Sequence, residues 1–381
     1  MTTTQTRAWD GEGLALVLSG GGARASYQVG VLSAIAERFP DLAIQILTGV
    51  SAGAINTVYL ASHPGPFHQT VEGLRTAWSR LRPEHVYRIQ PVHIGRALSQ
   101  WVVNMLLRRG SPRPSLRGLM DMNPLRGFLA ASMPVEGIQR NIDAGRIRAV
   151  ALSATCYNTG ATVTFVQAAS DVPLWERYMR IAVRTKITVG HLLASAAIPI
   201  VFPAVRLEDA FYGDGSVRQT APLAPAIRLG ARRIIGIAMR SRGNAESCAP
   251  TEQYPVAAEV FGMLFHSVFL DSLDADAERL ERINALLRAI PDQGAAPGGM
   301  RQVDLLLLRP SRDIGDLAKG RKVNLPRGVQ FVVSSIGGER ARSSDFLSYL
   351  MFQPDYTEIL MELGYEDGMS QGDRIDEFLG A

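Results

Sequence analysis

The sequence predicts an α/β fold of three layers, in which helices cover both faces of a mainly parallel central sheet, with a helical extension at the C-terminus. Two observations support this prediction. Between Leu14 and Ala61, a short apolar run, a glycine-rich turn and a helical pattern follow one another twice. A later apolar run, VDLLLL at Val303–Leu308, has the length of a buried strand. Strands that alternate with helices are typical of parallel sheets, because a crossover must bring the chain back to run in the same direction.

Each predicted element rests on its local pattern. An apolar run bounded by turn residues indicates a buried strand, and apolar residues spaced by three and four indicate a helix. Strands are predicted at Leu14–Leu18, Ile44–Leu47, Arg148–Ala154, Thr162–Val166, Arg233–Ala238 and Val303–Leu308, and helices at Tyr27–Phe39, Ala54–Ala61, Pro255–Ile290 and from Phe346 onward. In the last helical region, Pro354 indicates a helix start and Gly364 a helix end.

The chain is expected to divide into three parts. Residues 1–12 are polar and form a flexible tail, residues 13–240 form one α/β domain, and residues 241–381 form a mostly helical extension packed on the core. A seam within residues 241–251 is the alternative boundary between two domains. Residues 63 to about 140 lose the strand–helix rhythm and are rich in Arg, Pro and Gly, which indicates an insert of short helices and loops over the core.

The charge of the chain is unevenly spread. The net charge is +4, but ten arginines face only Glu84 and Asp121 between Arg75 and Arg126, a local balance of +8. Such a basic segment suggests an anionic partner, and its alternation of apolar clusters with arginines suits an interfacial helix at lipid headgroups. A solvated basic surface is the alternative interpretation.

Several classes of protein are not expected. The N-terminus lacks the apolar core of a secretory signal, and the longest low-charge stretch, residues 187–205, falls short of a membrane span, so we expect a cytoplasmic protein. Two cysteines, Cys156 and Cys248, cannot form a disulfide framework. No Cys/His cluster has zinc spacing, so we predict no structural metal.

The stretch GVSAG at Gly49–Gly53 fits the pattern G-x-S-x-G. In a strand-to-helix elbow, the two glycines remove Cβ clashes, and the serine hydroxyl is exposed at the edge of the sheet, at a helix N-terminus. Because IQIL precedes the motif and AINTVYLA follows it, the required strand and helix are both predicted. We therefore interpret Ser51 as a nucleophile. The alternative is a tight turn whose serine only caps a helix.

The stretch GGGARA at residues 20–25 allows two functional interpretations. It fits the dinucleotide pattern G-x-G-x-x-A, but that site needs an acidic residue at the end of the second strand, where Thr48, Gly49 and Val50 stand. The other interpretation is an oxyanion hole, because a glycine-rich turn that opens a helix supplies fixed N–H donors. Turns after neighbouring parallel strands lie at one edge, so Gly21 and Gly22 can face Ser51.

A serine nucleophile needs a base, and two candidates follow it in the chain. Asp214 stands between Gly213 and Gly215 after aromatic residues, which suits a tight turn that aims one carboxylate, although a plain Asp-Gly hairpin turn has the same sequence. His266 is the only histidine after Asp214, but its apolar surroundings favour a core residue.

These three segments together resemble the patatin-like phospholipases, a family of serine lipid acyl hydrolases, in the family's own order and over roughly residues 14–225. The resemblance also includes LLASAAIPIVFPAV at residues 192–205. It implies a dyad of Ser51 and Asp214 without a histidine. The implied oxyanion loop and the glycines that support the elbow and the aspartate turn are Gly20, Gly21, Gly22, Ala23 and Arg24, and Gly49, Gly53, Gly213 and Gly215.

The resemblance further implies a phospholipid or lysophospholipid substrate, no cofactor, and no nucleic-acid partner. It allows a peripheral position at an anionic membrane through the Arg75–Arg126 insert. Two residues depart from the family pattern: Ala25 replaces the last glycine of the loop, and Ser216 replaces a glycine or alanine of the aspartate turn. Both substitutes are small, so we expect the geometry to survive. Ser195, a further serine among small residues, is interpreted as helix packing.

Three other functions stay open at this point. The first is an esterase or thioesterase of the α/β-hydrolase type with a triad of Ser51, Asp214 and His266. The second is an acyltransferase of related fold, although such enzymes commonly have a histidine before the serine, where Val50 stands. The third is a lipid sensor without catalysis on the same scaffold.

Overall fold

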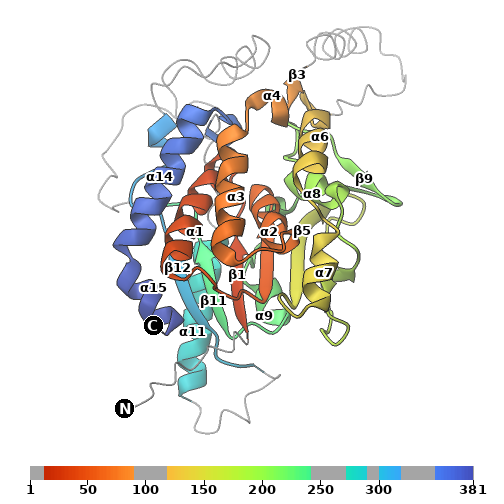
Figure 1. The fold of residues 1–381 in the computed structure, drawn as a ribbon. Helices are drawn as coiled ribbons and strands as arrows, with labels where there is room; N and C mark the ends of the chain where they lie inside the picture. The colour runs from red at the N-terminus through yellow and green to blue at the C-terminus, as the bar shows by residue number, and fades with distance from the viewer. Residues whose placement is uncertain (1–12, 90–117, 242–271, 290–299, 319–347, 381) are drawn as a thin grey trace, which may run out of the picture.

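The computed structural model describes residues 13–89, 118–241, 272–289, 300–318 and 348–380. A mixed, mostly parallel sheet lies at the centre of these residues, and helices cover both of its faces (Figure 1). This arrangement confirms the predicted fold class, including the helical region near the C-terminus.

Five parallel strands form one half of the sheet, in the order β12-β11-β1-β2-β5. Beyond β5 the sheet is mixed, because β6 is antiparallel to β5, β8 is parallel to β6, and β7 is antiparallel to β8. Strand β10 pairs with β5 and with β9. The bounds are β1 Leu14–Leu18, β2 Ile46–Val50, β5 Ala149–Cys156, β6 Thr162–Ala168, β7 Glu176–Arg177, β8 Arg180–Arg184, β9 Val205–Leu207, β10 Ala210–Asp214, β11 Arg233–Ile237 and β12 Asp304–Leu308.

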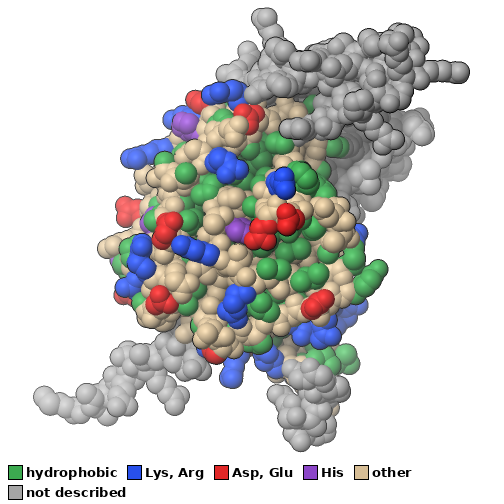
Figure 2. Space-filling view, turned by 90° about the vertical axis from the view of Figure 1, so that its right-hand side faces the viewer, with side chains coloured by type: hydrophobic (Ala, Val, Ile, Leu, Met, Phe, Trp, Pro, Cys, Tyr) green, Lys and Arg blue, Asp and Glu red, His purple; other side chains and the backbone are tan. Residues whose placement is uncertain are grey.

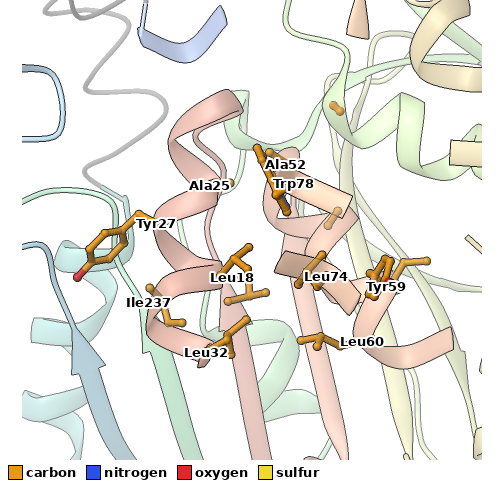
Figure 3. Close-up of a cluster of buried hydrophobic side chains, with 14 of the residues drawn as sticks. Leu18, Ala25, Tyr27, Leu32, Ala52, Tyr59, Leu60, Leu74, Trp78 and Ile237 are labelled. Atoms are coloured by element: carbon orange, nitrogen blue, oxygen red, sulfur yellow. The ribbon is translucent and has the colours of Figure 1, made fainter. Parts of the chain in front are cut away.

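The sheet separates two hydrophobic clusters. Alternate side chains of β1 enter opposite clusters, since Leu16 belongs to one and Val17 to the other. The larger cluster lies under α1, α2, α3 and α14, and the smaller one under α9 and α11. Figure 3 shows side chains of the larger cluster that come from α1, α2 and α3. The helices are α1 Ser26–Arg38, α2 Ala52–Ser62, α3 Phe67–Arg80, α4 Pro83–Val86, α6 Asn123–Ser132, α7 Gly137–Asp143, α8 Val189–Ala196, α9 Ala224–Arg228, α11 Ser272–Arg288, α14 Pro354–Ser370 and α15 Gly372–Leu379. A separate two-stranded ribbon pairs β3 Arg88–Ile89 with β4 Met120–Asp121.

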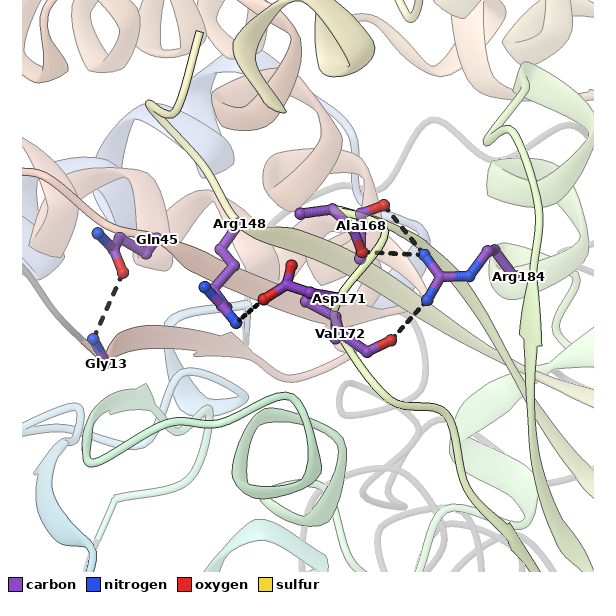
Figure 4. Close-up of polar contacts among 8 residues, drawn as sticks. Gly13, Gln45, Arg148, Ala168, Asp171, Val172 and Arg184 are labelled. Carbon is purple, nitrogen blue, oxygen red and sulfur yellow. Dashed lines mark hydrogen bonds and ion pairs between the residues drawn. The ribbon is translucent and has the colours of Figure 1, made fainter. Parts of the chain in front are cut away.

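Polar side chains fix several connections of the sheet (Figure 4). Arg148 pairs with Asp171 at 2.6 Å, before β5 and after β6. From β8, Arg184 donates to the carbonyl oxygens of Ala168, Ala169 and Val172. These bonds hold the turn after β6 against the neighbouring strand. On the described part of the face in Figure 2, basic and acidic side chains are interspersed rather than segregated.

The predicted helix end at Gly364 is wrong. Helix α14 begins at Pro354, as predicted, but it continues through Gly364 to Ser370. The glycine has another cause: a Cβ there would clash with the carbonyl oxygen of Tyr27 on α1. Gly30 on α1 has the reciprocal role, because its Cβ would clash with the carbonyl oxygen of Met361. The two helices therefore pack at backbone contact, which only glycine permits at these positions.

Several predictions fall partly outside the described residues. These include the centre of the basic insert (residues 90–117), the first half of the helix predicted at Pro255–Ile290, His266, Cys248 and the alternative seam. The membrane contact through Arg75–Arg126 and the division into three parts stay predictions. In the described residues, β12 joins the same sheet as β1. No helix in the described ranges is both long and apolar enough to span a membrane.

Candidate active site

Ser51 lies at a sharp elbow between β2 and α2. Its backbone has φ 55° and ψ −130°, and its side chain is 3% exposed. A positive φ is strained for a residue with a side chain, and the surrounding structure must hold it. A Cβ at Gly49 would clash with Thr57 and with the carbonyl oxygen of Gly53, and a Cβ at Gly53 would clash with the carbonyl oxygen of Leu18. The elbow therefore requires glycine on both sides of Ser51.

Asp214 meets Ser51 because β2 and β10 use successive stretches of one edge of β5. Strand β2 runs parallel to β5 and ends with Val50 opposite Ser153. Strand β10 runs antiparallel to β5 and ends with Asp214 opposite Ala154. The two strands thus approach each other end to end, and the residues at their ends face each other although they are far apart in the sequence.

The Asp214 carboxyl group is fully buried and incompletely hydrogen bonded. Its Oδ1 accepts a hydrogen bond of 2.8 Å from the amide of Ser216. Its Oδ2 has no hydrogen-bond partner among the described residues. Burial raises the pKa of Asp214 from 3.8 to about 6, while the nearby hydroxyls of Ser51 and Ser216 and the Ser216 amide act in the opposite direction. Oδ2 is therefore the oxygen that is available to accept a proton.

The backbone of Asp214 is fixed on both sides. Its amide donates to the carbonyl oxygen of Ala197 at 2.8 Å, and its carbonyl accepts from the Thr155 hydroxyl at 2.8 Å. Gly215 permits the turn, because a Cβ there would clash with the carbonyl oxygen of Ser153. A Cβ at Gly213 would clash with the Tyr157 ring, a partly exposed side chain. The carboxyl group thus sits on a rigid support.

The glycine loop after β1 lies against both residues. A Cβ at Gly20 would lie 3.0 Å from Cβ of Ser51 and 2.8 Å from the Ser216 hydroxyl, so the backbone alone fits there. Gly22 has φ 56° and opens a short 3-10 helix, Gly22–Ala25, that leads into α1. In the described residues, no backbone hydrogen bond outside the helices and strands uses the amide of Gly20, Gly21 or Gly22.

Arg24 turns away from solvent and toward the C-terminal part of the chain. Its side chain is 2% exposed, donates from Nε to the Ser348 hydroxyl at 2.6 Å, and lies 4.6 Å from the centre of the Tyr349 ring. Helix α1 also holds the start of the loop, because Gln28 of this helix donates to the carbonyl oxygen of Ser19 at 2.8 Å. Ala23 and Ala25 are fully buried, and the carbonyl of Ala25 accepts from Asn56.

Ser195 has a part in the site that we did not predict from the sequence. Its hydroxyl accepts a hydrogen bond of 3.0 Å from the Ser51 amide and donates one of 2.7 Å to the carbonyl oxygen of Ser153. It therefore links the elbow to β5. A separate pair of hydrogen bonds joins Trp78 of α3 through Asn56 of α2 to Gln28 of α1, all buried. A polar side chain in the otherwise apolar small-residue run LLASAA is the signal that points to Ser195.

An apolar cavity opens beside Ser51 and Gly22. Its walls come from α2, α3, α6, α8 and the segment before α14. Apart from Ser51 and Gly22, the lining residues are Ala52, Ile55, Tyr59, Leu74, Ala77, Trp78, Leu81, Val86, Leu125, Phe128, Leu129, Ser132, Met133, Ala196, Ile198, Phe202, Tyr349, Leu350 and Phe352. Almost all of these side chains are apolar, so the cavity suits a hydrocarbon chain. Within the described ranges, no group of three or more His, Cys, Asp or Glu side chains is placed to bind a metal ion.

Solved structures that match this chain include human GIVD cytosolic phospholipase A2 in complex with methyl gamma-linolenyl fluorophosphonate, at 14% identity and a TM-score of 0.44. The match covers 97% of this chain and 58% of that one, so this chain spans about three fifths of its length. VipD from Legionella pneumophila is 12% identical with a TM-score of 0.38, over 95% of this chain and 67% of that one. The type III effector ExoU of Pseudomonas aeruginosa is 14% identical with a TM-score of 0.34, over 95% and 53%.

Comparison with curated proteins gives no match. The family model described as patatin-like phospholipase matches residues 16–227, which is more than half of the chain. This range contains the glycine loop, the elbow and the aspartate turn. The chain belongs to the patatin-like phospholipase family.

Proposed function

We propose that this protein is a lipid acyl hydrolase that cleaves carboxylic esters of phospholipids or lysophospholipids, with Ser51 as nucleophile and Asp214 as base. One observation carries the proposal: β5 holds the ends of β2 and β10 together, so that a strained serine and a buried carboxyl group meet beside an apolar cavity. A nucleophile, a base within reach and a site for the acyl chain are what ester cleavage requires.

In the first half of the reaction, Oδ2 of Asp214 takes the hydroxyl proton as Oγ of Ser51 bonds to the ester carbonyl carbon. The carbonyl π electrons move to oxygen, where the amides of Gly21 and Gly22 and the N-terminus of α2 stabilise the negative charge. When the carbonyl re-forms, the bond to the alcohol oxygen breaks, and Asp214 returns the proton to that leaving group. The product left on the enzyme is an acyl ester of Ser51.

In the second half, Asp214 removes a proton from water, and the water oxygen bonds to the acyl carbon. The bond to Oγ then breaks, Ser51 regains its proton from Asp214, and the fatty acid leaves. A pKa of about 6 makes Asp214 a stronger base than an ordinary carboxylate and still leaves it mostly ionised at neutral pH. Burial therefore adapts this carboxyl group to the task that a histidine has in other serine hydrolases.

A fluorophosphonate reagent tests the proposal directly, because it phosphonylates an activated serine. Mass spectrometry of the labelled protein should place the adduct on Ser51, and incubation with a phospholipid mixture should release fatty acid from the wild type but not from Ser51→Ala. A protein that binds lipid but neither labels nor releases fatty acid would be a sensor. A His266→Ala variant as inactive as Ser51→Ala would instead indicate an α/β-hydrolase triad.

The Ser195→Ala variant should weaken catalysis without abolishing it. Loss of the hydroxyl leaves the buried Ser51 amide without its acceptor, at a cost of about 1–3 kcal/mol, and frees the strained elbow to relax. We expect kcat to fall on the order of 10-fold to 10²-fold with KM little changed, because the substrate cavity keeps its lining. Steady-state kinetics measure this effect. Ser33→Ala removes a helix-surface hydroxyl bonded to Val29 and is the matched control; equal rates in the two variants would contradict a positioning role.

A further inference from the structure

The match to the family ends at residue 227, yet a short segment far beyond it reaches the candidate site. Residues 348–352 precede α14, and their side chains are almost completely buried. This inference rests on the function proposed above: we propose that Ser348–Phe352 belongs to the ester-cleaving site. It positions the oxyanion loop, and it forms one wall of the acyl cavity.

The positioning role follows from two contacts with the loop. The Ser348 hydroxyl accepts the hydrogen bond of Arg24, and the Tyr349 ring lies against the Arg24 guanidinium. The carbonyl oxygen of Tyr349 packs so closely on Gly22 that a Cβ there would clash with it. Arg24 and Gly22 belong to the 3-10 turn that presents the loop amides. Movement of residues 348–349 would therefore displace the donors that the reaction needs in the transition state.

The cavity role follows from three residues of the segment. Tyr349, Leu350 and Phe352 line the same cavity as Ser51. The Phe352 ring stacks on Trp78 of α3, with ring centres 6.2 Å apart, and the carbonyl oxygen of Leu350 accepts a hydrogen bond of 3.0 Å from the Tyr87 hydroxyl. An acyl chain in the cavity must contact this wall, so the segment contributes to the recognition of the chain.

The packing of α14 explains how a remote segment can hold such a precise position. The segment is continuous with α14, which packs on α1 at backbone contact through Gly30 and Gly364. Tyr27 of α1 donates to Asp367 of α14 at 3.0 Å, and α1 itself begins directly after the loop. The glycine loop thus leads into α1, and the segment at residues 348–352 leads into α14, and these two helices are tightly packed on each other. Their relative position is set by that helix pair.

Ser348→Ala tests the positioning role in the full-length protein. Fluorophosphonate titration first counts the active sites, and kcat is then expressed per labelled site with a phospholipid substrate. We expect kcat per site to fall between about tenfold and 10²-fold with KM unchanged, because donor misplacement acts on the transition state. Ser370→Ala, which removes a hydroxyl from the far end of α14, should keep the wild-type value.

A purely structural serine would give a different result: fewer labelled sites but an unchanged kcat for each one, which would overturn the positioning role. Ser51→Ala in the same assay separates this inference from the proposed function. If Ser51→Ala remains active, the proposed function is wrong. If Ser51→Ala is inactive while Ser348→Ala matches Ser370→Ala per site, only the further inference is wrong.

Phe352→Ala tests the cavity wall, and it does so even if Ser348→Ala fails to fold. With p-nitrophenyl esters of long and short acyl chains, we expect the ratio of kcat/KM for long to short chains to fall about tenfold, because only the long chain loses contact with the ring. Phe378→Ala removes the same ring from α15, where it packs on Arg233 outside the cavity, and should leave the ratio unchanged. An unchanged ratio in Phe352→Ala would overturn the assignment of the wall.

Discussion

Asp214→Asn should lower kcat on the order of 10³-fold to 10⁴-fold while the protein stays folded. An asparagine has the size of the aspartate and keeps the oxygen that accepts from Ser216, but it cannot take the Ser51 proton. The lost step is proton transfer, so KM should change little. Single-turnover kinetics with a phospholipid substrate measure the loss. A variant that keeps more than a tenth of the wild-type rate would contradict Asp214 as the base.

The same substitution should stabilise the protein at neutral pH. The folded-state pKa of Asp214 is raised from 3.8 to about 6, so the native state retains a proton that the unfolded chain releases between these values. The free energy of unfolding of the wild type therefore falls as pH rises through this window and levels off above about pH 6. At 1.36 kcal/mol per pKa unit, the full effect is about 3 kcal/mol.

Asparagine does not titrate, so Asp214→Asn avoids this loss. We expect its free energy of unfolding to exceed the wild-type value by up to about 3 kcal/mol at pH 7, and the difference to shrink toward pH 4. Urea titrations at both pH values measure it, and activity against pH should show an acidic limb near pH 6 in the wild type. A difference that grows toward low pH would contradict the burial of an ionised group. A variant more stable but inactive is the usual sign of a site strained for function.

Gly30→Ala should cost at least about 2 kcal/mol of stability and lower activity as well. A Cβ at this position clashes with the carbonyl oxygen of Met361, so α14 must move away from α1. Because α14 continues the segment at residues 348–352, its displacement should also widen the cavity and disturb the oxyanion loop. Denaturant unfolding and steady-state kinetics measure the two effects together.

Gly127→Ala is the matched control for this helix substitution. Gly127 lies on the exposed side of α6, and a Cβ there meets nothing within 4 Å. Alanine favours the helix over glycine by about 0.5–1 kcal/mol, so this variant should be slightly more stable than the wild type. The same replacement of glycine by alanine should thus lower the free energy of unfolding in α1 and raise it in α6. If both variants were less stable than the wild type, the expected preference of a helix for alanine over glycine would be wrong, and the packing of Gly30 on Met361 would not be at fault.

Local patterns in the sequence predicted most of the fold. Strand β1 has the predicted bounds, and α1 and α2 lie within two residues of theirs, because buried apolar runs and glycine turns are strong local signals. The strand predicted at Ile44–Leu47 begins two residues later, at Ile46, and ends three residues later, at Val50, because residues 48–50 also pair with β5. The prediction of a helix end at Gly364 is wrong because the sequence alone does not distinguish a glycine at a helix–helix contact from one at a helix end.

The remote contributions to the site could not be predicted from local patterns. The Ser51 amide meets Ser195, and Arg24 meets Ser348, across 144 and 324 residues respectively. Only the tertiary fold determines such pairs, and a single serine has no distinctive sequence signature. By contrast, Ser51 and Asp214 each lie in a short motif with flanking glycines, so local patterns make both residues candidates without knowledge of the fold.

The shared edge of β5 sets the spacing of Ser51 and Asp214, the two residues that we propose to react. The strand pairing places Val50 opposite Ser153 and Asp214 opposite Ala154, so two consecutive residues of β5 set that spacing. Intervening loops can therefore change in length or sequence while Ser51 and Asp214, the proposed nucleophile and base, stay in register, provided that β5 keeps both partner strands and that the contacts from Ser195 and Ala197 remain.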